Sequence, residues 1–362
     1  MKISFILPAD NLSGGIRVIA IYAKKLKERG HDVFIVMPPS RPRNFKERVK
    51  SVLSWGWVKK TFEPKNSFFD GQDVRPQVLE KYRPVKDKDL PDADVVVATW
   101  WETAEWVANL SKSKGIKAYF IQGHEVFDFC PKERVIATYL LPFHKITIST
   151  WLADLMRTRY GDPAVSLVPN SVDTEQFYAR PRGKQKEPTV GMLYSTFAWK
   201  GCDVGLKAFS LAAQKTPGLR LVAYGLRKPS AKLSLPPGSY YVQQPAQNTI
   251  KDIYAQCDAW LFTSRSEGFG LPILEAMACR TPVIGTPAGA APELLASGGG
   301  ILVKPEDSED MAKAIIRVCC MQENEWEKMS EDANKQAVKY TWDDAAKLFE
   351  RKLSELIGIK LL

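Results

Sequence analysis

The chain has 362 residues, enough for two domains of ordinary size, and its 45% hydrophobic content supports sizeable cores. No stretch reaches the roughly 20 apolar residues of a membrane-spanning helix. The apolar part of the N-terminus is too short for a signal peptide, so we expect a cytoplasmic protein. The formal net charge of +10 favours anionic partners. Because no nucleic-acid-binding module accompanies that charge, we expect a membrane surface or a polyanionic ligand rather than nucleic acid.

Metal-binding motifs are absent from the sequence. The six cysteines form no CxxC pair, and none is spaced as in a zinc site with His31, His124 or His144, the three histidines. Reduced thiols packed in cores are therefore the expected state of the cysteines. We expect no metal centre.

The first predicted elements are a strand at 3–7, a loop that ends in Gly14 and Gly15, a helix from Ile16 to about residue 29, and a strand at 33–37. This order is typical of a Rossmann-like domain. The glycines do not form the GxGxxG pattern, so the dinucleotide fingerprint is missing. An NAD-dependent oxidoreductase is therefore disfavoured.

Residues 41–65 interrupt the α/β pattern. They contain eight lysines or arginines and two glutamates, which leaves a net charge of +6. An apolar helical face includes Phe45 and Leu53, and Trp55 and Trp57 lie nearby. A basic amphipathic helix with tryptophans is typical of peripheral contact with an anionic membrane, at the cytoplasmic face in this case. The alternative is a surface excursion that packs on its own domain.

From Asp94 onward, strands and helices alternate again, which predicts parallel sheets in both halves of the chain. The predicted strands are 94–98, 118–121, 146–148, 166–168, 189–192, 219–223, 240–242, 259–263, 282–284 and 301–303. The predicted helices are 103–110, 203–213, 249–256, 270–280 and 308–320. We place an N-terminal Rossmann-like domain at 1–174, a second at 175–342, and a C-terminal helix at 343–362 that packs back toward the first domain.

The segment 263–287 links a buried strand to a helix and carries the most informative pattern. Gly268 and Gly270 allow the backbone to approach a ligand closely. Glu267 and Glu275 are eight positions apart on either side of a helix N-terminus, whose free N–H groups favour an anion. Acceptor groups that flank an anion site suit a nucleotide sugar, which has hydroxyls on both sides of a diphosphate.

This segment resembles the E-x7-E signature of retaining glycosyltransferases of family 4, also described as glycosyl transferases group 1. The resemblance extends to Gly14–Gly15 and to residues 168–177, 200–203 and 299–307. It implies an α/β GT-B architecture, in which two Rossmann-like parallel-sheet domains face each other across a cleft. The N-terminal domain would bind the acceptor and the C-terminal domain the nucleotide sugar.

The implied activity is transfer of a sugar from a nucleoside diphosphate to a glycan, lipid-linked or small-molecule acceptor, in polysaccharide or glycoconjugate biosynthesis. Configuration would be retained and no metal or other cofactor would be needed. The resemblance assigns catalytic roles to Lys200, Glu267 and His124. Lys200 would oppose the charge that develops on the diphosphate, and Glu275 would accept both ribose hydroxyls. The implied donor-binding residues are Gly14, Gly15, Lys200, Glu267, Gly268, Phe269, Gly270, Leu271 and Glu275.

Two departures from the family pattern concern the diphosphate and the sugar. Ser195 stands where the family often has an arginine, so Arg227 or Arg265 is a candidate to assist at the diphosphate. The N-terminal domain histidine of the family aligns with Gln122, and His124 is two residues further along. Either side chain could face the transferred sugar.

Two other functions fit the same fold. A sugar-nucleotide epimerase would need acid and base groups around C2 of the sugar, and it has no need of the E-x7-E arrangement. A non-catalytic nucleotide-sugar-binding protein would not need Lys200, Glu267 and Glu275 together. The nucleotide base, the sugar and the acceptor depend on loop shapes that a sequence pattern does not specify.

Overall fold

The computed structural model describes residues 1–11, 13–41 and 67–359. The chain divides into two compact units: unit 1 comprises residues 1–148, 153–168 and 346 onward, and unit 2 comprises 149–152 and 169–345. The basic segment 41–65, predicted to contact a membrane, lies outside the described residues except for Arg41. In the part of the chain that is described, no helix combines the length and apolarity needed to cross a bilayer.

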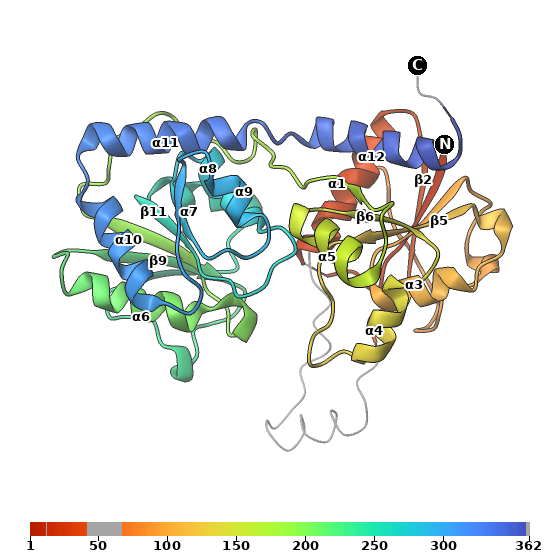
Figure 1. Ribbon diagram of the computed structural model, residues 1–362, viewed down its shortest axis with the longest axis horizontal. Coiled ribbons are helices and arrows are strands. Elements are labelled where there is room, and N and C mark those ends of the chain that lie inside the picture. The colour runs from red at the N-terminus through yellow and green to blue at the C-terminus, as the bar shows by residue number, and fades with distance from the viewer. Residues whose placement is uncertain (12, 42–66, 360–362) are drawn as a thin grey trace. The chain divides into compact units, whose positions relative to one another are not determined.

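Unit 1 is built on a seven-stranded sheet with strand order β3-β2-β1-β4-β5-β6-β7, and every neighbouring pair is parallel (Figure 1). This is the strand order of Rossmann folds, in which the order reverses between the first and fourth strands. The strands are β1 Lys2–Ile6, β2 Asp32–Met37, β3 Gln77–Val78, β4 Val95–Ala98, β5 Ile116–Ile121, β6 His144–Thr147 and β7 Ser166–Leu167.

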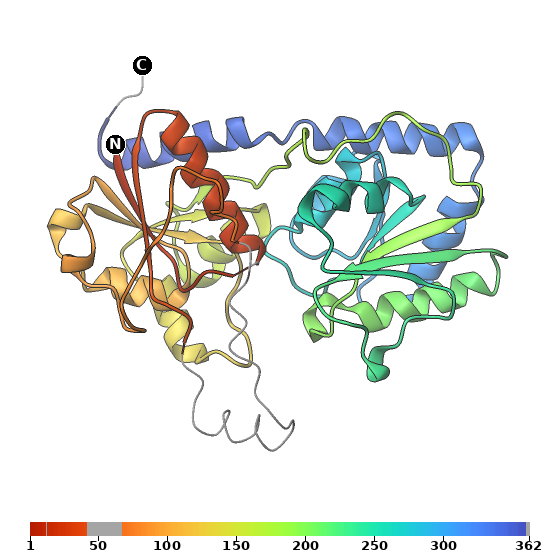
Figure 2. The ribbon, with the colours of Figure 1, turned by 180° about the vertical axis from the view of Figure 1, so that it is seen from behind.

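The helices of this region are α1 Gly14–Glu28, α3 Trp101–Ala108, α4 Lys132–Tyr139 and α5 Thr150–Tyr160, with short 3-10 turns at Asp87–Asp89 and Lys112–Lys114. Figure 2 shows α1 lying over the sheet of unit 1. The predicted helix 103–110 begins two residues earlier, because the Thr103 hydroxyl accepts hydrogen bonds from the N–H groups of Thr99 and Trp100 at 2.9 and 3.0 Å. These bonds fix the first turn of α3.

The last helix of the chain, α12 (Trp342–Leu356), contributes to the core of unit 1. The Phe349 ring lies 4.7 Å from Tyr22, 5.1 Å from Phe120 and 6.2 Å from Phe5, measured between ring centroids. Buried aromatic rings remove large apolar areas from water. The C-terminal residues are therefore part of the same core as the first strand.

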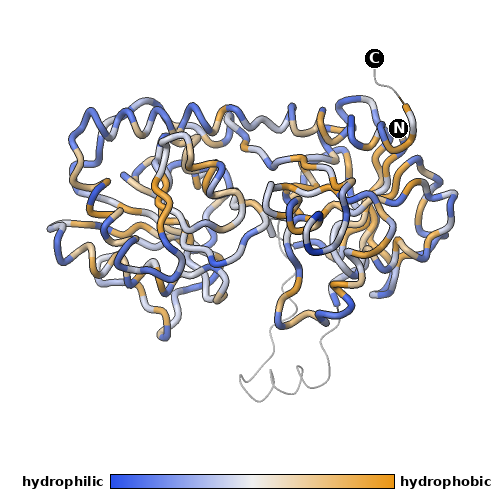
Figure 3. Tube along the Cα trace, viewed as in Figure 1, coloured by the Kyte–Doolittle hydropathy of each residue, from blue (hydrophilic) through white to orange (hydrophobic). Residues whose placement is uncertain are grey.

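Unit 2 repeats the Rossmann arrangement with six parallel strands in the order β10-β9-β8-β11-β12-β13. The strands are β8 Thr189–Leu193, β9 Arg220–Gly225, β10 Tyr240–Gln243, β11 Ala259–Phe262, β12 Val283–Gly285 and β13 Gly300–Leu302. The central strands β8 and β11 are almost wholly buried, as expected for a sheet covered on both faces. In Figure 3 the hydrophobic residues colour mainly the inner strands.

The helices of unit 2 are α6 Cys202–Ala213, α7 Ile250–Ala255, α8 Leu271–Ala278, α9 Ala291–Leu295, α10 Ser308–Cys320 and α11 Glu323–Ala337, with 3-10 turns at Ala198–Lys200, Ala231–Leu233 and Gln247–Thr249. The sequence prediction contained α6, α7, α8 and α10 but not α9 or α11. Most of α11 is polar, and few of its side chains, Trp326 among them, are buried. Apart from Trp326, its buried face consists of small or polar side chains, which give little apolar signal in the sequence.

Candidate active site

Lys200 and Glu267 come from two neighbouring strands of unit 2. Lys200 ends the 3-10 turn that follows β8, and Glu267 lies in the loop that follows β11. Since β8 and β11 pair at the point where the strand order reverses, their loops leave the edge of the sheet where such folds bind ligands. The Lys200 Nζ donates a hydrogen bond to Glu267 Oε1 at 2.5 Å. An ammonium group has three donors, so this bond by itself leaves capacity for a diphosphate.

The turn that carries Lys200 is held against the β11 loop through backbone contacts. The Thr263 hydroxyl donates to the Lys200 carbonyl at 2.7 Å. Gly201 has φ of 59°, and a Cβ there would lie 2.0 Å from the Thr263 carbonyl oxygen. Only glycine satisfies both requirements without strain. The Ser264 hydroxyl also donates to Glu267 Oε1 at 2.7 Å, which orients that carboxylate.

Arg265, a candidate for the missing arginine, is fully engaged by the protein. Its guanidinium makes two hydrogen bonds to Asp203, two to Glu306 and one to the Ala198 carbonyl, at 2.6 to 2.8 Å. An arginine has five N–H donors, and these five bonds use all of them. Arg265 in this arrangement offers no donor to a phosphate. Arg227, the other candidate, is exposed in the loop after β9.

Glu275 lies in the second turn of α8 and is buried, with 5% of its surface exposed. The Tyr254 hydroxyl donates to Glu275 Oε2 at 2.9 Å, and the Tyr224 hydroxyl lies 3.0 Å from that of Tyr254. Burial, and then the charge of Glu275, raise the pKa of Tyr254 well above its ordinary value. The tyrosine therefore stays protonated and remains a donor to the carboxylate.

The loop between the two glutamates is held by residues that the sequence analysis did not single out. The Ser149 hydroxyl and the Trp151 indole N–H donate to the Gly268 carbonyl at 2.7 and 2.9 Å. These partners are 119 and 117 positions away in the chain, so no local pattern relates them to the loop. The Phe269 side chain is buried, and its carbonyl accepts from the Ala290 N–H at 2.8 Å.

The helix N-terminus predicted beside the anion site begins one residue later than expected. Gly270 has φ of 98° and is the N-cap of α8, so Leu271 is the first helical residue. A Cβ at Gly270 would lie 2.8 Å from the Phe262 ring, which explains why glycine is required here. Pro272 falls in the first turn, where its missing N–H costs nothing.

In unit 1, Gly14 and Gly15 are the first residues of α1 rather than the end of the predicted loop. Ser13 is the N-cap, and its hydroxyl accepts from the Ile16 N–H at 3.5 Å. The Gln122 side-chain amide donates to the Gly15 carbonyl at 3.2 Å. The structure thus brings Gln122, which follows β5, to the glycine pair that follows β1.

His124 has a different set of contacts. Its Nε2 lies 2.8 Å from the Tyr160 hydroxyl, and its ring lies 5.8 Å from that of Tyr139. Burial, together with the charge of Arg159, lowers the pKa of His124, which favours the neutral imidazole. Of the two predicted candidates for the sugar, Gln122 is therefore the one in contact with the glycine pair.

The neighbouring Glu125 is a buried acid that the sequence analysis did not select. Its Oε2 accepts hydrogen bonds from the Trp101 N–H at 2.8 Å and from the Tyr119 hydroxyl at 3.0 Å. Burial raises the pKa of Glu125 to about 8, so the carboxyl is largely protonated at neutral pH. The network attaches the start of the loop after β5 to the N-terminus of α3.

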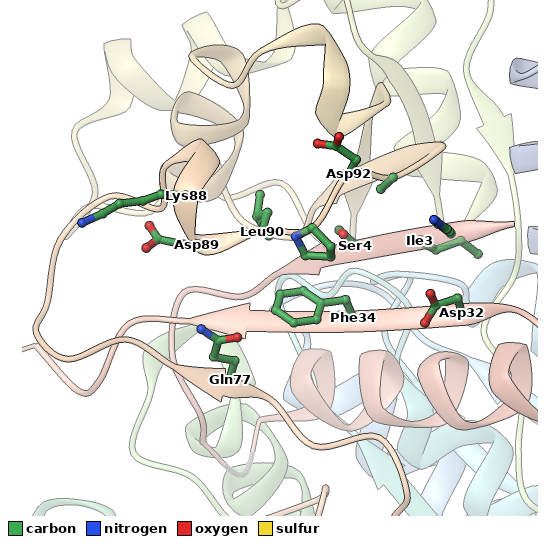
Figure 4. A pocket seen from close by; sticks show the side chains of 12 residues that line it. Ile3, Ser4, Asp32, Phe34, Gln77, Lys88, Asp89, Leu90 and Asp92 are labelled. Atoms are coloured by element: carbon green, nitrogen blue, oxygen red, sulfur yellow. The ribbon is translucent and has the colours of Figure 1, made fainter.

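A cavity of about 460 Å³ in unit 1 lies elsewhere, beside the first residues of β1 and β2 (Figure 4). Its lining includes Asp89 and Asp92, but these carboxylates accept hydrogen bonds from Arg83 and Lys114. Ligands of such sheets bind at the opposite, carboxyl ends of the strands. Within the described residues, no group of three or more His, Cys, Asp or Glu side chains could hold a metal ion.

Comparison with known proteins identifies the family. Residues 12–176 match the family model described as Glycosyltransferase Family 4, and residues 173–337 match Glycosyl transferases group 1. The phosphatidylinositol N-acetylglucosaminyltransferase gpi3 subunit of Schizosaccharomyces pombe is 24% identical over 259 residues, 67% of this chain and 56% of that protein. A D-inositol 3-phosphate glycosyltransferase of Saccharomonospora viridis is 30% identical over 160 residues, 40% of this chain and 37% of that protein. The chain thus spans about half the length of the curated relatives it matches.

Solved structures with the same fold include a sucrose-phosphate synthase from Thermosynechococcus elongatus, with a TM-score of 0.75, 16% identity and 99% coverage of both chains. Another is Anabaena Alr3699/HepE in complex with UDP-glucose, with a TM-score of 0.72, 17% identity, and coverage of 98% of this chain and 100% of that one. Two Rossmann-like units and this likeness define the GT-B class of fold. The chain belongs to the family 4, or group 1, glycosyltransferases.

Proposed function

We propose that this chain is a retaining glycosyltransferase that moves a sugar from a nucleoside diphosphate to a glycan, lipid-linked or small-molecule acceptor. The observation that carries the proposal is the contact between Lys200 and Glu267 at the strand-order reversal of unit 2. In this proposal the Lys200 ammonium opposes the negative charge that develops on the leaving diphosphate. The chemistry needs no metal, because this cation and the N-terminus of α8 meet the phosphate charge.

In this proposal, the remaining predicted residues bind different parts of the donor molecule. Glu275 accepts the ribose hydroxyls, through the small part of its surface that Tyr254 and the core leave exposed. Glu267 and the backbone of residues 269–271 hold the transferred sugar. In unit 1, the Gly14–Gly15 start of α1, with Gln122 against it, remains a proposed donor-binding element. HepE, which is similar in fold, is known in complex with UDP-glucose, which supports a UDP-sugar as the first donor to test.

Phosphorylated compounds are the first acceptors to test. Two similar curated proteins are named for phosphatidylinositol and inositol phosphate, and this chain carries a net charge of +10. A basic protein attracts anionic acceptors and anionic membrane surfaces by long-range electrostatics. We therefore propose an anionic acceptor, with the basic segment 41–65 as an additional contact to membranes.

The test is a thermal-stability screen of the full chain with UDP-, GDP- and dTDP-sugars, followed by measurement of nucleoside diphosphate release with inositol phosphate and phosphatidylinositol as acceptors. A donor present at 100 times its dissociation constant adds about 2.7 kcal/mol to the free energy of unfolding. Glu275→Gln is the matched control and should lose this stabilisation. Absence of a shift with every nucleotide sugar would refute the proposal. Conversion of the sugar without release of diphosphate would indicate an epimerase instead.

A further inference from the structure

Arg265 joins three loops of unit 2 that follow three different strands. Asp203 stands at the start of α6, after β8; Arg265 follows β11; and Glu306 follows β13. Each carboxylate receives two hydrogen bonds from the guanidinium, at 2.8 and 2.8 Å for Asp203 and at 2.6 and 2.8 Å for Glu306. Bidentate arginine–carboxylate pairs fix the relative orientation of the two groups as well as the distance between them.

The same residue also holds the backbone of the turn that ends in Lys200. The Arg265 guanidinium donates to the Ala198 carbonyl at 2.6 Å, and the Arg265 backbone N–H donates to the Trp199 carbonyl at 2.8 Å. The two residues immediately before Lys200 are thus attached to Arg265, which itself lies two positions before Glu267. A lysine at this position could not form the same set of bonds, because it lacks the planar guanidinium group of arginine.

The backbone conformation of Glu306 indicates that its contact with Arg265 forms at a cost in conformational energy. Glu306 has φ of 58°, a left-handed conformation that is unfavourable for a residue with a side chain. Strained residues of this kind persist where the surrounding contacts require them, and they concentrate at functional sites. The Glu306 carboxylate accepts two hydrogen bonds from Arg265, and the next residue, Asp307, is the N-cap of α10.

The cluster fixes geometry as well as contributing to stability. The side chains of Asp203 and Glu306 are 59% and 57% exposed, so solvent screens the charges, while the bidentate pairing still sets the orientation of the three loops. Hydrogen bonding to Arg265 lowers the pKa of Asp203, so its carboxylate stays charged across the physiological range. The pair between Asp203 and Arg265 therefore persists near neutral pH and can hold the geometry of the turn.

We propose that Arg265 is a positioning residue, which fixes the Lys200 turn against the Glu267 loop and thereby sets where the ammonium group meets the donor diphosphate. This inference rests on the proposed function.

The test compares the binding of UDP and UMP, and of GDP and GMP, to the full-length chain by titration calorimetry. Lys200→Ala should weaken diphosphate binding while leaving monophosphate binding nearly unchanged, since the monophosphates lack the β-phosphate. Arg265→Ala should weaken diphosphate binding about tenfold in the same selective way, a size typical of residues coupled within one network. Arg265→Lys should restore it only in part.

The decisive measurement is the double variant, because a residue that acts through Lys200 has no effect once Lys200 is gone. Lys200→Ala with Arg265→Ala should bind diphosphates no more weakly than Lys200→Ala alone. Arg220→Ala, which removes an exposed ion pair with Glu187 at the other end of the strands, should bind as the wild type does. Asp203→Asn and Glu306→Gln, which keep Arg265, should each show a smaller selective loss, so the inference stays testable if Arg265→Ala folds poorly.

Two results would overturn the inference while leaving the proposed function in place. One is an Arg265→Ala variant with wild-type diphosphate affinity beside a Lys200→Ala variant that has lost it. The other is an additive loss in the double variant. A Lys200→Ala variant that binds diphosphates normally would instead refute the role of Lys200 in the proposed function, and the inference with it.

Discussion

Glu125 provides a prediction about stability that is independent of the donor site. Its carboxyl is 2% exposed, and burial raises its pKa from 4.5 to about 8 in the folded chain. In the unfolded chain the group titrates near its ordinary value. Between about pH 4.5 and 8, unfolding therefore releases a proton, and the stability of the fold falls as the pH rises.

The magnitude follows from the two pKa values. Their difference corresponds to about 5 kcal/mol in total, or at most about 1.4 kcal/mol per pH unit within that window. Glu125→Gln keeps the shape of the protonated acid and an oxygen for the Trp101 and Tyr119 donors, but it does not titrate. The variant should gain stability relative to the wild type steadily from pH 5 to 8, and the gain should level off above pH 8.

The assay is urea denaturation from pH 5 to 9, followed by hydrogen-exchange mass spectrometry of peptides that span residues 95–125. Peptide-level detection measures the unfolding of unit 1 separately, because two units need not unfold together. Glu133→Gln, at an exposed position of α4, controls for the loss of a carboxylate. Any unmet hydrogen bond of the glutamine adds a constant that does not vary with pH. Parallel stability profiles for Glu125→Gln and the wild type would refute the reasoning.

Three further predictions concern the candidate site and the basic segment. Glu275→Gln should abolish sugar transfer while the melting temperature falls by only a few degrees, because the amide oxygen still accepts from Tyr254; near-normal turnover would remove Glu275 from the site. Gly201→Ala should destabilise the fold by at least about 1–2 kcal/mol and suppress transfer, since its Cβ would lie 2.0 Å from the Thr263 carbonyl oxygen. Wild-type stability in urea denaturation together with normal transfer activity would contradict this geometry. The full chain should sediment with anionic vesicles at low salt and be released at 0.5 M salt, and a variant with the lysines and arginines of 41–65 changed to glutamine should not; equal binding by both would exclude that segment.

The sequence by itself determined the α/β class and much of the donor-site pattern. Alternating apolar strands and amphipathic helices are local periodicities, so a parallel fold in both halves could be predicted without coordinates. The spacing of Glu267 and Glu275 around a glycine-rich helix start is equally local. Elements with little apolar content, such as α11, could not be predicted, because the face that they bury carries mostly small or polar side chains.

Only the tertiary structure decided which side chains meet. Lys200 and Glu267 are 67 positions apart and come together because β8 and β11 are neighbours in the sheet. The same strand order brings Asp203 and Glu306 to Arg265, which converts an expected phosphate ligand into a residue saturated by the protein. Strand order is set by the packing of the whole unit, and no spacing along the chain encodes it directly.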